Sequence, residues 1–170
     1  MQIIPNCHPL EQVKKFKGRI YGAFEYKGSE LPYKVIHYLS RLTSEPKNSV
    51  NKTEETIDAV LAELAEIRKD FENRIYVPEG DGHHLFKAIE ARRMIDMLEI
   101  MYLTYKERTE TRGYHMRGDY TERNDTEMIK WICVDCGKDG RPVVSFERIP
   151  FERYKWKPEE WNDEAGAIVS

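Results

Sequence analysis

Residues His83–Arg108 read HHLFKAIEARRMIDMLEIMYLTYKER, and neither glycine nor proline interrupts them. Their apolar side chains recur mostly at spacings of three and four, the pattern expected for an amphipathic α-helix. Two adjoining stripes result: one holds Phe86, Ile89, Met97, Met101 and Tyr105, and the other holds Leu85, Ala88, Ile95, Leu98 and Tyr102. Because a helix with two adjoining stripes is packed on more than one side, residues 83–108 are predicted to form the central helix of a bundle.

The residues before this helix predict an antiparallel partner. Thr53 has the side chain of an N-cap, and Glu54 and Glu55 place negative charge in the first helical turn. From residue 53 to residue 73 the apolar residues form a single stripe, made of Ile57, Val60, Leu61, Leu64, Ile67 and Phe71. The breaker at residues 77–82 is short and offers Asp81 as a cap for the next helix, so the two helices are expected to run antiparallel.

Two more helices are predicted upstream. Residues 11–21 have a short helical pattern, and Pro32 suits the first turn of a helix over residues 33–42. The polar stretch at residues 43–51 is interpreted as a loop. The helix at 33–42 is expected to complete a three-helix bundle with residues 53–73 and 83–108.

The region after residue 125 predicts a β-hairpin. Residues 128–134 and 142–149 are β-prone, and the Gly-Lys-Asp-Gly turn at 137–140 separates them. A lone hairpin is marginal in water, so this one should lie on the helices. Residues 150–170 are interpreted as an extended tail.

The predicted fold is therefore mainly α: a spectrin-repeat-like three-helix bundle with a C-terminal β-hairpin and an extended tail. We expect three parts along the chain. Residues 1–52 pack on the bundle, residues 53–125 form the bundle core with an arginine-rich segment, and residues 126–170 form the hairpin and tail.

Composition limits the possible functions. The chain has 170 residues, with 27 Lys and Arg against 30 Asp and Glu, and the net charge of −3 argues against a nucleic-acid partner. No apolar run approaches the roughly 20 residues of a membrane span, so no direct membrane insertion is expected. The first nine residues do not read as a secretory signal, and three cysteines do not make a disulfide scaffold, so a cytoplasmic location is expected.

The cysteine pattern is a candidate metal or redox site. Cys133 and Cys136 form a single Cys-x-x-Cys, whereas a structural zinc site needs four ligands. Only Cys7 and His8 could supply the other two. A thioredoxin-like pair would open a helix after a strand, which the predicted hairpin does not provide. We interpret the pair as ordinary turn cysteines, with metal or redox chemistry as the alternative.

Other candidate sites are weaker. His83 and His84 are adjacent, so on a helix they point about 100° apart and do not chelate one ion together. Met94, Met97 and Met101 are interpreted as core packing. The chain contains no glycine-rich phosphate loop and no nucleophile elbow, so the sequence shows no complete active site.

The arginine-rich segment, residues 107–125, reads ERTETRGYHMRGDYTERND. Its arginines alternate with acids, aromatics and glycines, and Gly113 permits a turn or a close backbone approach. One interpretation is a solvated loop whose charges pair among themselves. The other is an ordered docking segment, because arginine forms planar, bidentate pairs with carboxylates. The residues alone leave both open.

This segment resembles the arginine-rich motif near the C-terminus of the fumarate reductase and succinate dehydrogenase flavoprotein family, approximately R-x-E-S-R-G-x-H-x-R-x-D-Y-P-x-R-D-D. Ten positions are in register: Arg108, Glu110, Arg112, Gly113, His115, Arg117, Asp119, Tyr120, Arg123 and Asp125. Thr111, Thr121 and Asn124 depart from the motif. The stretch LFKAIEARRMIDMLE resembles the family's long helix, the Trp131 hairpin and PFERYKWKP resemble its closing segment, and residues 21–64 are nearer to the adenylylsulfate reductase α-subunit branch.

The resemblance implies a C-terminal helical domain that packs against the flavin-binding and capping domains of such an enzyme. It further implies that FAD and the chemistry belong to those domains, that the isolated chain is inactive and binds no cofactor alone, and that the substrate is a small anion or a sulfur compound. An iron–sulfur subunit is a further implied partner, which would place the chain at the membrane periphery through partner subunits.

The expected domain-docking residues are Arg108, Arg112, His115, Arg117, Asp119, Tyr120 and Arg123. No catalytic, cofactor-binding or metal residue is expected. The alternative function is a stand-alone helical adaptor that presents the same arginine-rich surface to an unrelated anionic partner.

Overall fold

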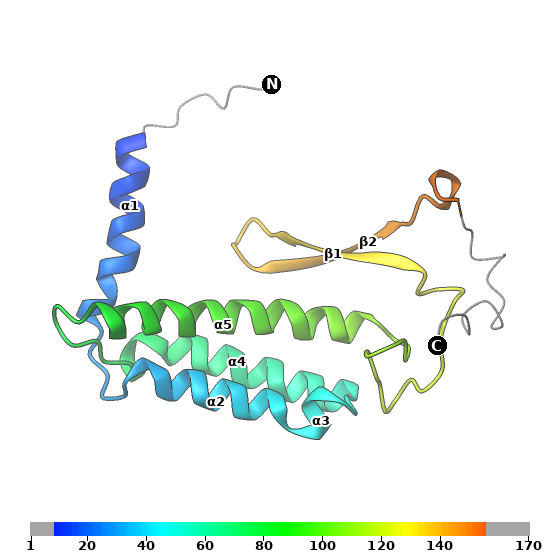
Figure 1. Cartoon of the computed structure of the whole chain (residues 1–170), viewed down its shortest axis with the longest axis horizontal. Helices are drawn as coiled ribbons and strands as arrows, with labels where there is room; N and C mark the ends of the chain where they lie inside the picture. The colour runs from blue at the N-terminus through cyan, green and yellow to red at the C-terminus, as the bar shows by residue number, and fades with distance from the viewer. Residues whose placement is uncertain (1–8, 156–170) are drawn as a thin grey trace.

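The computed structural model describes residues 9–155 and is mainly helical, as predicted (Figure 1). Its helices and strands follow in this order: α1 Pro9–Tyr21, the 3-10 helix η1 Gly22–Glu25, α2 Pro32–Ser44, α3 Pro46–Ser49, α4 Glu54–Arg74, α5 Gly82–Glu107, β1 Lys130–Cys136, β2 Pro142–Arg148 and the 3-10 helix η2 Phe151–Arg153. No helix within these residues is both long and apolar enough to cross a membrane.

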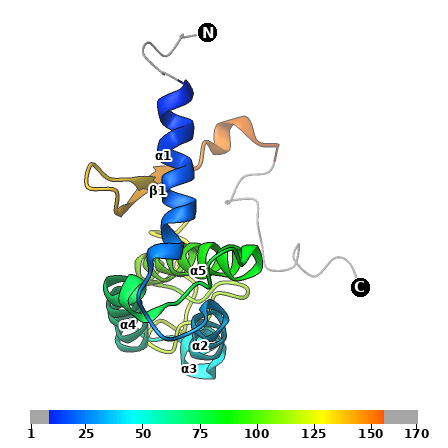
Figure 2. The same cartoon turned by 90° about the vertical axis from the view of Figure 1, so that its left-hand side faces the viewer.

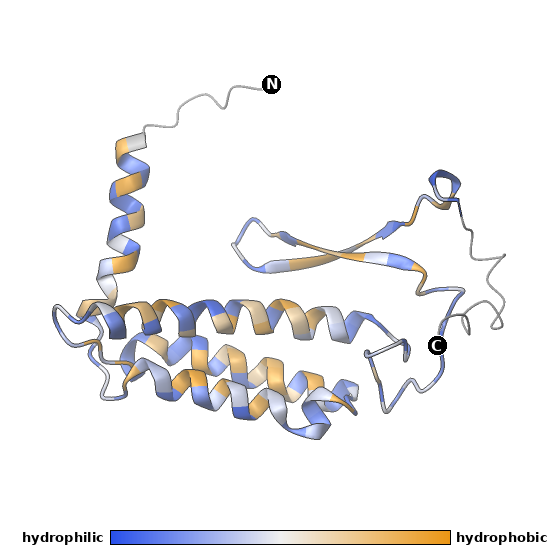
Figure 3. Ribbon diagram, in the orientation of Figure 1, coloured by the Kyte–Doolittle hydropathy of each residue, from blue (hydrophilic) through white to orange (hydrophobic). Residues whose placement is uncertain are grey.

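Helices α2, α4 and α5 form the predicted three-helix bundle, seen nearly end-on in Figure 2. Helix α5 is the central member, because it packs against both α2 and α4. Figure 3 shows the apolar positions of the bundle in orange. The buried core comes from all three helices, from η1 and from the segment between α4 and α5: Ala23, Val35, Leu39, Ile57, Val60, Leu64, Ile67, Phe71, Ile75, Val77, Leu85, Ala88, Ala91, Ile95, Leu98 and Tyr102.

Both predicted helix caps are present. The Thr53 Oγ1 atom accepts a hydrogen bond from the Thr56 backbone N–H at 3.3 Å, and the Thr56 hydroxyl oxygen accepts one from the Thr53 N–H at 2.9 Å. Asp81 accepts a hydrogen bond from the His84 N–H at 3.0 Å and so caps α5. These side chains satisfy N–H groups that the first helical turns leave without partners, which fixes where α4 and α5 begin.

The first apolar stripe predicted for α5 is only partly buried. Phe86 and Met97 are 63% and 64% exposed, whereas all members of the second stripe are buried. Helices α2 and α4 cover one side of α5, and these two positions lie outside that contact. The expected core packing of Met97 is therefore wrong, while Met94 and Met101 are partly buried against the core.

The expected loop over residues 43–51 was also wrong in part. Helix α2 continues to Ser44, and the short helix α3 begins at Pro46. Asn48 holds these residues in place. Its side-chain N–H donates to the Leu42 carbonyl at 2.8 Å, and its backbone carbonyl accepts a hydrogen bond from the Tyr102 hydroxyl at 2.8 Å. The loop is thus fastened to the end of α2 and to α5.

The predicted hairpin is present and lies along α5 (Figure 1). Strands β1 and β2 are antiparallel, with Lys130 opposite Arg148, and Gly140 adopts a φ of 77° in the turn. Arg141 fastens the turn to α5 through an ion pair with Glu99 at 3.0 Å. Cys133 lies opposite Ser145 in the middle of β1, so its assignment to a turn was wrong.

Some expectations lie outside the described residues. Cys7 and His8, the only ligands offered to complete a zinc site, precede residue 9, and the tail beyond residue 155 is likewise not described. The proposed division at residues 52 and 125 stays a prediction.

Gly28 gives a test of how the helices are joined. Its N–H donates to the Ile75 carbonyl at 2.9 Å, and a Cβ atom at this position would lie 2.0 Å from the Arg74 carbonyl carbon. We expect Gly28→Ala to lower the free energy of unfolding by about 1–3 kcal/mol, because backbone rather than a flexible side chain must move. Urea unfolding followed by circular dichroism measures this.

Gly18 is the matched control. No atom lies within 4 Å of a Cβ built there, and the residue sits inside α1. Gly18→Ala should leave stability unchanged or raise it by up to about 1 kcal/mol. Equal losses for both variants would contradict this account of the close approach at Gly28.

Candidate functional site

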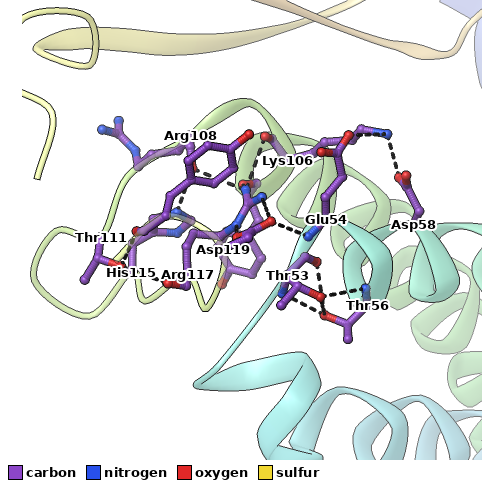
Figure 4. A network of polar contacts seen from close by, with 12 residues as sticks. Thr53, Glu54, Thr56, Asp58, Lys106, Arg108, Thr111, His115, Arg117 and Asp119 are labelled. Atoms are coloured by element: carbon purple, nitrogen blue, oxygen red, sulfur yellow. Dashed lines mark hydrogen bonds and ion pairs between the residues drawn. The ribbon is translucent and has the colours of Figure 1, made fainter. Parts of the chain in front are cut away.

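The arginine-rich segment leaves the C-terminal end of α5 and passes the N-terminal end of α4 (Figure 4). It is tied to the chain before α4, because the Gly118 N–H donates to the Lys52 carbonyl at 2.7 Å. Within the segment, Arg112 and His115 exchange two backbone hydrogen bonds at 2.8 and 3.0 Å. Gly113 takes a φ of 57° in the turn between them. The segment is therefore an ordered loop.

Arg117 is the most deeply buried arginine of this loop, with 1% of its surface exposed. Its Nε and Nη2 atoms donate to the two carboxylate oxygens of Asp119, each at 2.7 Å. Its Nη1 atom donates to the backbone carbonyl of Tyr105 at 2.7 Å. A helix leaves its last carbonyls without intrahelical partners and carries partial negative charge there, so a buried cation is well placed at the end of α5.

Asp119 extends the contact to the next helix. Its Oδ2 atom accepts a hydrogen bond at 2.7 Å from the backbone N–H of Glu54, in the first turn of α4 (Figure 4). The negative carboxylate thus lies where α4 carries partial positive charge. Hydrogen bonds from Arg117, and then from Glu54, outweigh burial and lower the pKa of Asp119 to about 2. The Arg117–Asp119 pair therefore joins the end of α5 to the start of α4.

Two further basic groups lie beside this pair. Lys52 is 2% exposed, donates from Nζ to the Ser49 carbonyl at 2.6 Å, and lies 4.7 Å from the centre of the Tyr105 ring. Burial, and then the charge of Arg117, lower the pKa of Lys52. His115 donates from Nε2 to the Arg108 carbonyl at 3.1 Å. Burial lowers the pKa of His115, so its neutral form is favoured at neutral pH.

Glu110 is a second buried centre, and its side chain has no exposed surface. It accepts hydrogen bonds of 2.8 Å from Arg108 and, through both oxygens, from Arg112. The Asn124 backbone N–H adds one at 2.9 Å. Burial alone would raise the pKa of Glu110, but the bonds from Arg112, Asn124 and Arg108 outweigh it and hold the pKa below its ordinary value.

The outer edge of the network is more exposed. Asp125 accepts from Arg112 at 2.5 Å and pairs with Arg123 at 2.5 Å, and about 44% of the side chains of both Asp125 and Arg123 is exposed. Hydrogen bonds from Arg123, and then from Arg112, lower the pKa of Asp125. The Tyr120 ring, 39% exposed, lies 4.9 Å from the Arg117 guanidinium carbon.

The structure thus brings the predicted docking residues together in one network. The partner types expected for Arg112 and Arg117, carboxylates and backbone carbonyls, are present, but they come from this chain. Contact between the set and another domain stays a prediction. Sequence reasoning did not include Glu110 in the set, although its place in the motif was a signal, and it missed Lys52 and Tyr105, for which no local signal exists.

The described residues offer little for metal or redox chemistry. No group of three His, Cys, Asp or Glu side chains within residues 9–155 is placed to hold a metal ion. Cys133 and Cys136 are free thiols on one strand, three positions apart, and therefore face opposite sides of the hairpin. Burial, and then the charges of Glu147 and Asp135, raise the pKa of Cys133, which disfavours its reactive thiolate.

Comparison with known proteins gives consistent matches. Residues 41–162 match the family described as fumarate reductase flavoprotein C-term. The succinate dehydrogenase flavoprotein subunit of Rickettsia felis is 26% identical over 110 residues, which are 63% of this chain and 18% of that protein. The chain therefore spans less than a fifth of the length of this curated relative.

Solved structures share the fold. The E. coli quinol fumarate reductase FrdA chain superposes with a TM-score of 0.75 at 17% identity, over 91% of this chain and 27% of that chain. Adenylylsulfate reductase from Archaeoglobus fulgidus superposes with a TM-score of 0.71 at 21% identity, over 82% of this chain and 24% of that chain.

The bundle, the hairpin and the loop fastened by Arg117 and Asp119 form a helical domain of the flavoprotein C-terminal class. The chain belongs to the fumarate reductase flavoprotein C-terminal family. It carries the C-terminal domain of a flavoprotein of the fumarate reductase, succinate dehydrogenase and adenylylsulfate reductase type, which confirms the resemblance seen in the sequence.

The Arg117–Asp119 pair can be tested by removing one partner. We expect Asp119→Ala to lower the free energy of unfolding by about 3 kcal/mol, because a buried guanidinium loses its counter-charge. This loss of unfolding free energy should lie at the low end of the range for buried ion pairs, since 27% of the Asp119 side chain is exposed. Chemical denaturation of purified variants measures it.

Arg93→Ala is the control, because the Arg93 side chain is 63% exposed and pairs with Asp96 at 3.4 Å. Its effect should be within about 0.5 kcal/mol. If Asp119→Ala cost no more than Arg93→Ala, the pair would not be what joins the two helices.

The lowered carboxyl pKa values predict loss of stability in acid. The pKa of Asp119 is about 2 against an ordinary 3.8, so its ionised form stabilises the folded chain above pH 3.8 and this contribution disappears as the pH falls towards 2. Glu110 and Asp125 act in the same direction. Urea unfolding at a series of pH values should therefore show a steeper acid loss for the wild-type chain than for Asp119→Asn.

Proposed function

We propose that this chain supports the flavin-binding and capping domains of an FAD-dependent oxidoreductase and does not itself carry the chemistry. The observation that carries this proposal is the Arg117–Asp119 pair, which lies inside the family match and connects the ends of two bundle helices. Such a pair gives the loop a fixed shape without a partner. A loop with a fixed shape loses less conformational entropy when another domain packs on it.

The docking residues have two roles in this proposal. Arg117, Asp119 and His115 are positioning residues, because their charged or polar atoms are engaged inside the chain. The other members of the set contact the partner domains directly: Arg108, Arg112, Tyr120 and Arg123. Tyr114, fully exposed at the tip of the turn, adds an aromatic side chain to this surface.

FAD is proposed to bind elsewhere in the enzyme. A dinucleotide site needs a parallel sheet whose strands lead through a glycine-rich turn into a helix. The only sheet within residues 9–155 is a two-stranded antiparallel hairpin, so these residues do not fit FAD. The substrate is proposed to be a small anion or a sulfur compound, and an iron–sulfur subunit to be a partner that links the enzyme to the membrane periphery.

The stand-alone adaptor is less well supported. It would need an arginine-rich surface free to bind an unrelated anion, whereas Arg117 is buried and joined to Asp119. Membership of the flavoprotein family also favours a supporting domain.

Reconstitution tests the proposal. We expect the purified chain alone to bind no FAD and to show no oxidoreductase activity, because its described residues provide no dinucleotide site. Added to the flavin-bearing remainder of the enzyme, the chain should raise the temperature at which flavin is released, since a ligand that binds only the folded state stabilises it. Flavin fluorescence during heating measures this release.

Arg123→Ala should weaken the association by about tenfold if Arg123 contacts the partner. Arg153→Ala, at an exposed position in η2, is the control. Turnover by the isolated chain, or a flavin-release temperature that the chain does not change, would overturn the proposed function.

A further inference from the structure

His115 lies where the arginine-rich segment meets the end of α5 (Figure 4). Its Nε2 atom donates to the Arg108 carbonyl at 3.1 Å, which ties the turn of the segment to the end of that helix. The centre of its ring lies 5.6 Å from the centre of the Tyr105 ring. The Lys52 ammonium, from the chain before α4, lies 4.7 Å from the centre of the same Tyr105 ring. The imidazole therefore holds the segment on α5 beside a buried lysine.

The two buried cations near His115 are not equally compensated. Asp119 neutralises Arg117 through two hydrogen bonds of 2.7 Å. Lys52 is 2% exposed and donates from Nζ to the Ser49 carbonyl at 2.6 Å, but it forms no ion pair with any carboxylate within residues 9–155. Lys52 thus brings to the cluster one positive charge that no described anion offsets.

The other charged groups around His115 do not offset this charge either. At the end of α5, the Arg108 guanidinium pairs with Glu110 at 2.8 Å. The backbone of Arg112 is hydrogen-bonded to that of His115, but its guanidinium pairs with Glu110 and Asp125. Among the described residues, no carboxylate forms an ion pair with His115 itself. The surroundings therefore suit a neutral ring and provide no anion for a charged one.

Protonation of His115 changes two things at once. The neutral ring that donates from Nε2 has an unprotonated Nδ1 atom, and protonation turns Nδ1 into a second donor. The Nε2 bond is the only side-chain hydrogen bond of His115 within residues 9–155, so the new donor has no acceptor there. A charged ring also lies beside Lys52 and Arg117. Burial, and then the neighbouring cations led by Lys52, hold the pKa of His115 below its ordinary 6.5.

We propose that His115 is a pH switch of the arginine-rich segment: the neutral imidazole holds the turn on the end of α5, and its protonation releases the turn while the three-helix bundle stays folded. In the released turn the charged ring is hydrated and lies away from the buried lysine. The bundle stays folded because its core contains no residue of the segment. This behaviour belongs to the chain alone and does not depend on the proposed function.

The direction of the pH dependence follows from the two forms of the turn. The open turn binds the proton more readily, so the opening equilibrium constant rises as the pH falls below the ordinary histidine pKa of 6.5. A single proton limits the rise to about tenfold per pH unit, and the rise ends once the closed turn is protonated as well. Asp119 stays ionised throughout this range, since its pKa is about 2.

Hydrogen exchange of the full chain between about pH 5 and pH 8 tests the switch, with protection factors that remove the pH dependence of intrinsic exchange. The Arg112 and His115 amides donate within the turn at 2.8 and 3.0 Å, and the Gly118 amide donates to the Lys52 carbonyl at 2.7 Å. Protection at these three amides should fall about fivefold or more from pH 8 to pH 5. Amides inside α4 and α5 should keep their protection.

Two variants separate His115 from other titrating groups. His115→Gln cannot be protonated but keeps a side-chain N–H that reaches towards the Arg108 carbonyl, so protection of the turn should stay constant over the same pH range. His37→Gln is the matched control, because His37 is exposed on α2, away from the segment. It should keep the wild-type pH dependence.

The ring itself gives a second measurement. A nuclear magnetic resonance titration of the wild-type His115 ring should have its midpoint below pH 6.5. Lys52→Met removes the neighbouring charge and keeps an apolar stem, so it should move this midpoint to a higher pH. Lys69→Met is the control, because Lys69 is 77% exposed towards the other end of α4. It should leave the midpoint unchanged.

Several results would overturn the switch. Protection of the turn that is constant between pH 5 and pH 8, or that falls equally in His115→Gln, would do so. An equal fall at amides inside α4 and α5 would also overturn it, because the whole bundle would then be unfolding. If the turn of His115→Gln were unprotected at every pH, the ring titration decides: a wild-type midpoint at or above 6.5, or no shift in Lys52→Met, would contradict the switch.

Discussion

The bidentate pair between Arg117 and Asp119 is the contact on which the order of the arginine-rich segment depends. Its cation lies against the carbonyl end of α5 and its anion against the N–H end of α4, so each charge meets the helix terminus of opposite partial charge. A buried ion pair usually gains little net stability, because both charges lose their hydration. Here backbone groups of two helices replace much of that hydration, which explains how a guanidinium with 1% exposure is accommodated.

The same arrangement determines which charged groups of the segment are buried and which are exposed. Lys52, Arg117 and neutral His115 lie close together, and burial together with neighbouring cations disfavours further positive charge there. Glu110, in the same segment, accepts hydrogen bonds from Arg108 and Arg112. Although the strongest donors and acceptors are satisfied within the chain, the surface left for a partner carries the exposed charges of Glu122, Arg123 and Asp125 beside the exposed rings of Tyr114 and Tyr120.

Much of the fold could be predicted because its signals are local. The Thr53 cap, the apolar spacing of α4 and the Gly-Lys-Asp-Gly turn each lie within a few residues of the structure that they specify. The exposure of Phe86 and Met97 could not be predicted, since periodicity gives the apolar sides of a helix but not which of them is covered. The burial of Lys52 depends on its contact with Gly118, far along the chain. For the same reason the sequence left open whether Arg117 pairs inside the chain or outside it.

Helix α1 and the arginine-rich segment differ in what they leave exposed. In the segment, nearly every charged group has a partner within the chain, whereas α1 exposes the apolar side chains of Leu10, Val13 and Phe16. Exposed apolar area contributes favourable free energy only when something covers it. The segment is therefore suited to hold its own shape, whereas the apolar side of α1 stabilises the fold only when another surface covers it. A supporting domain needs both properties, because a docking surface keeps its affinity only where the elements that form it stay fixed.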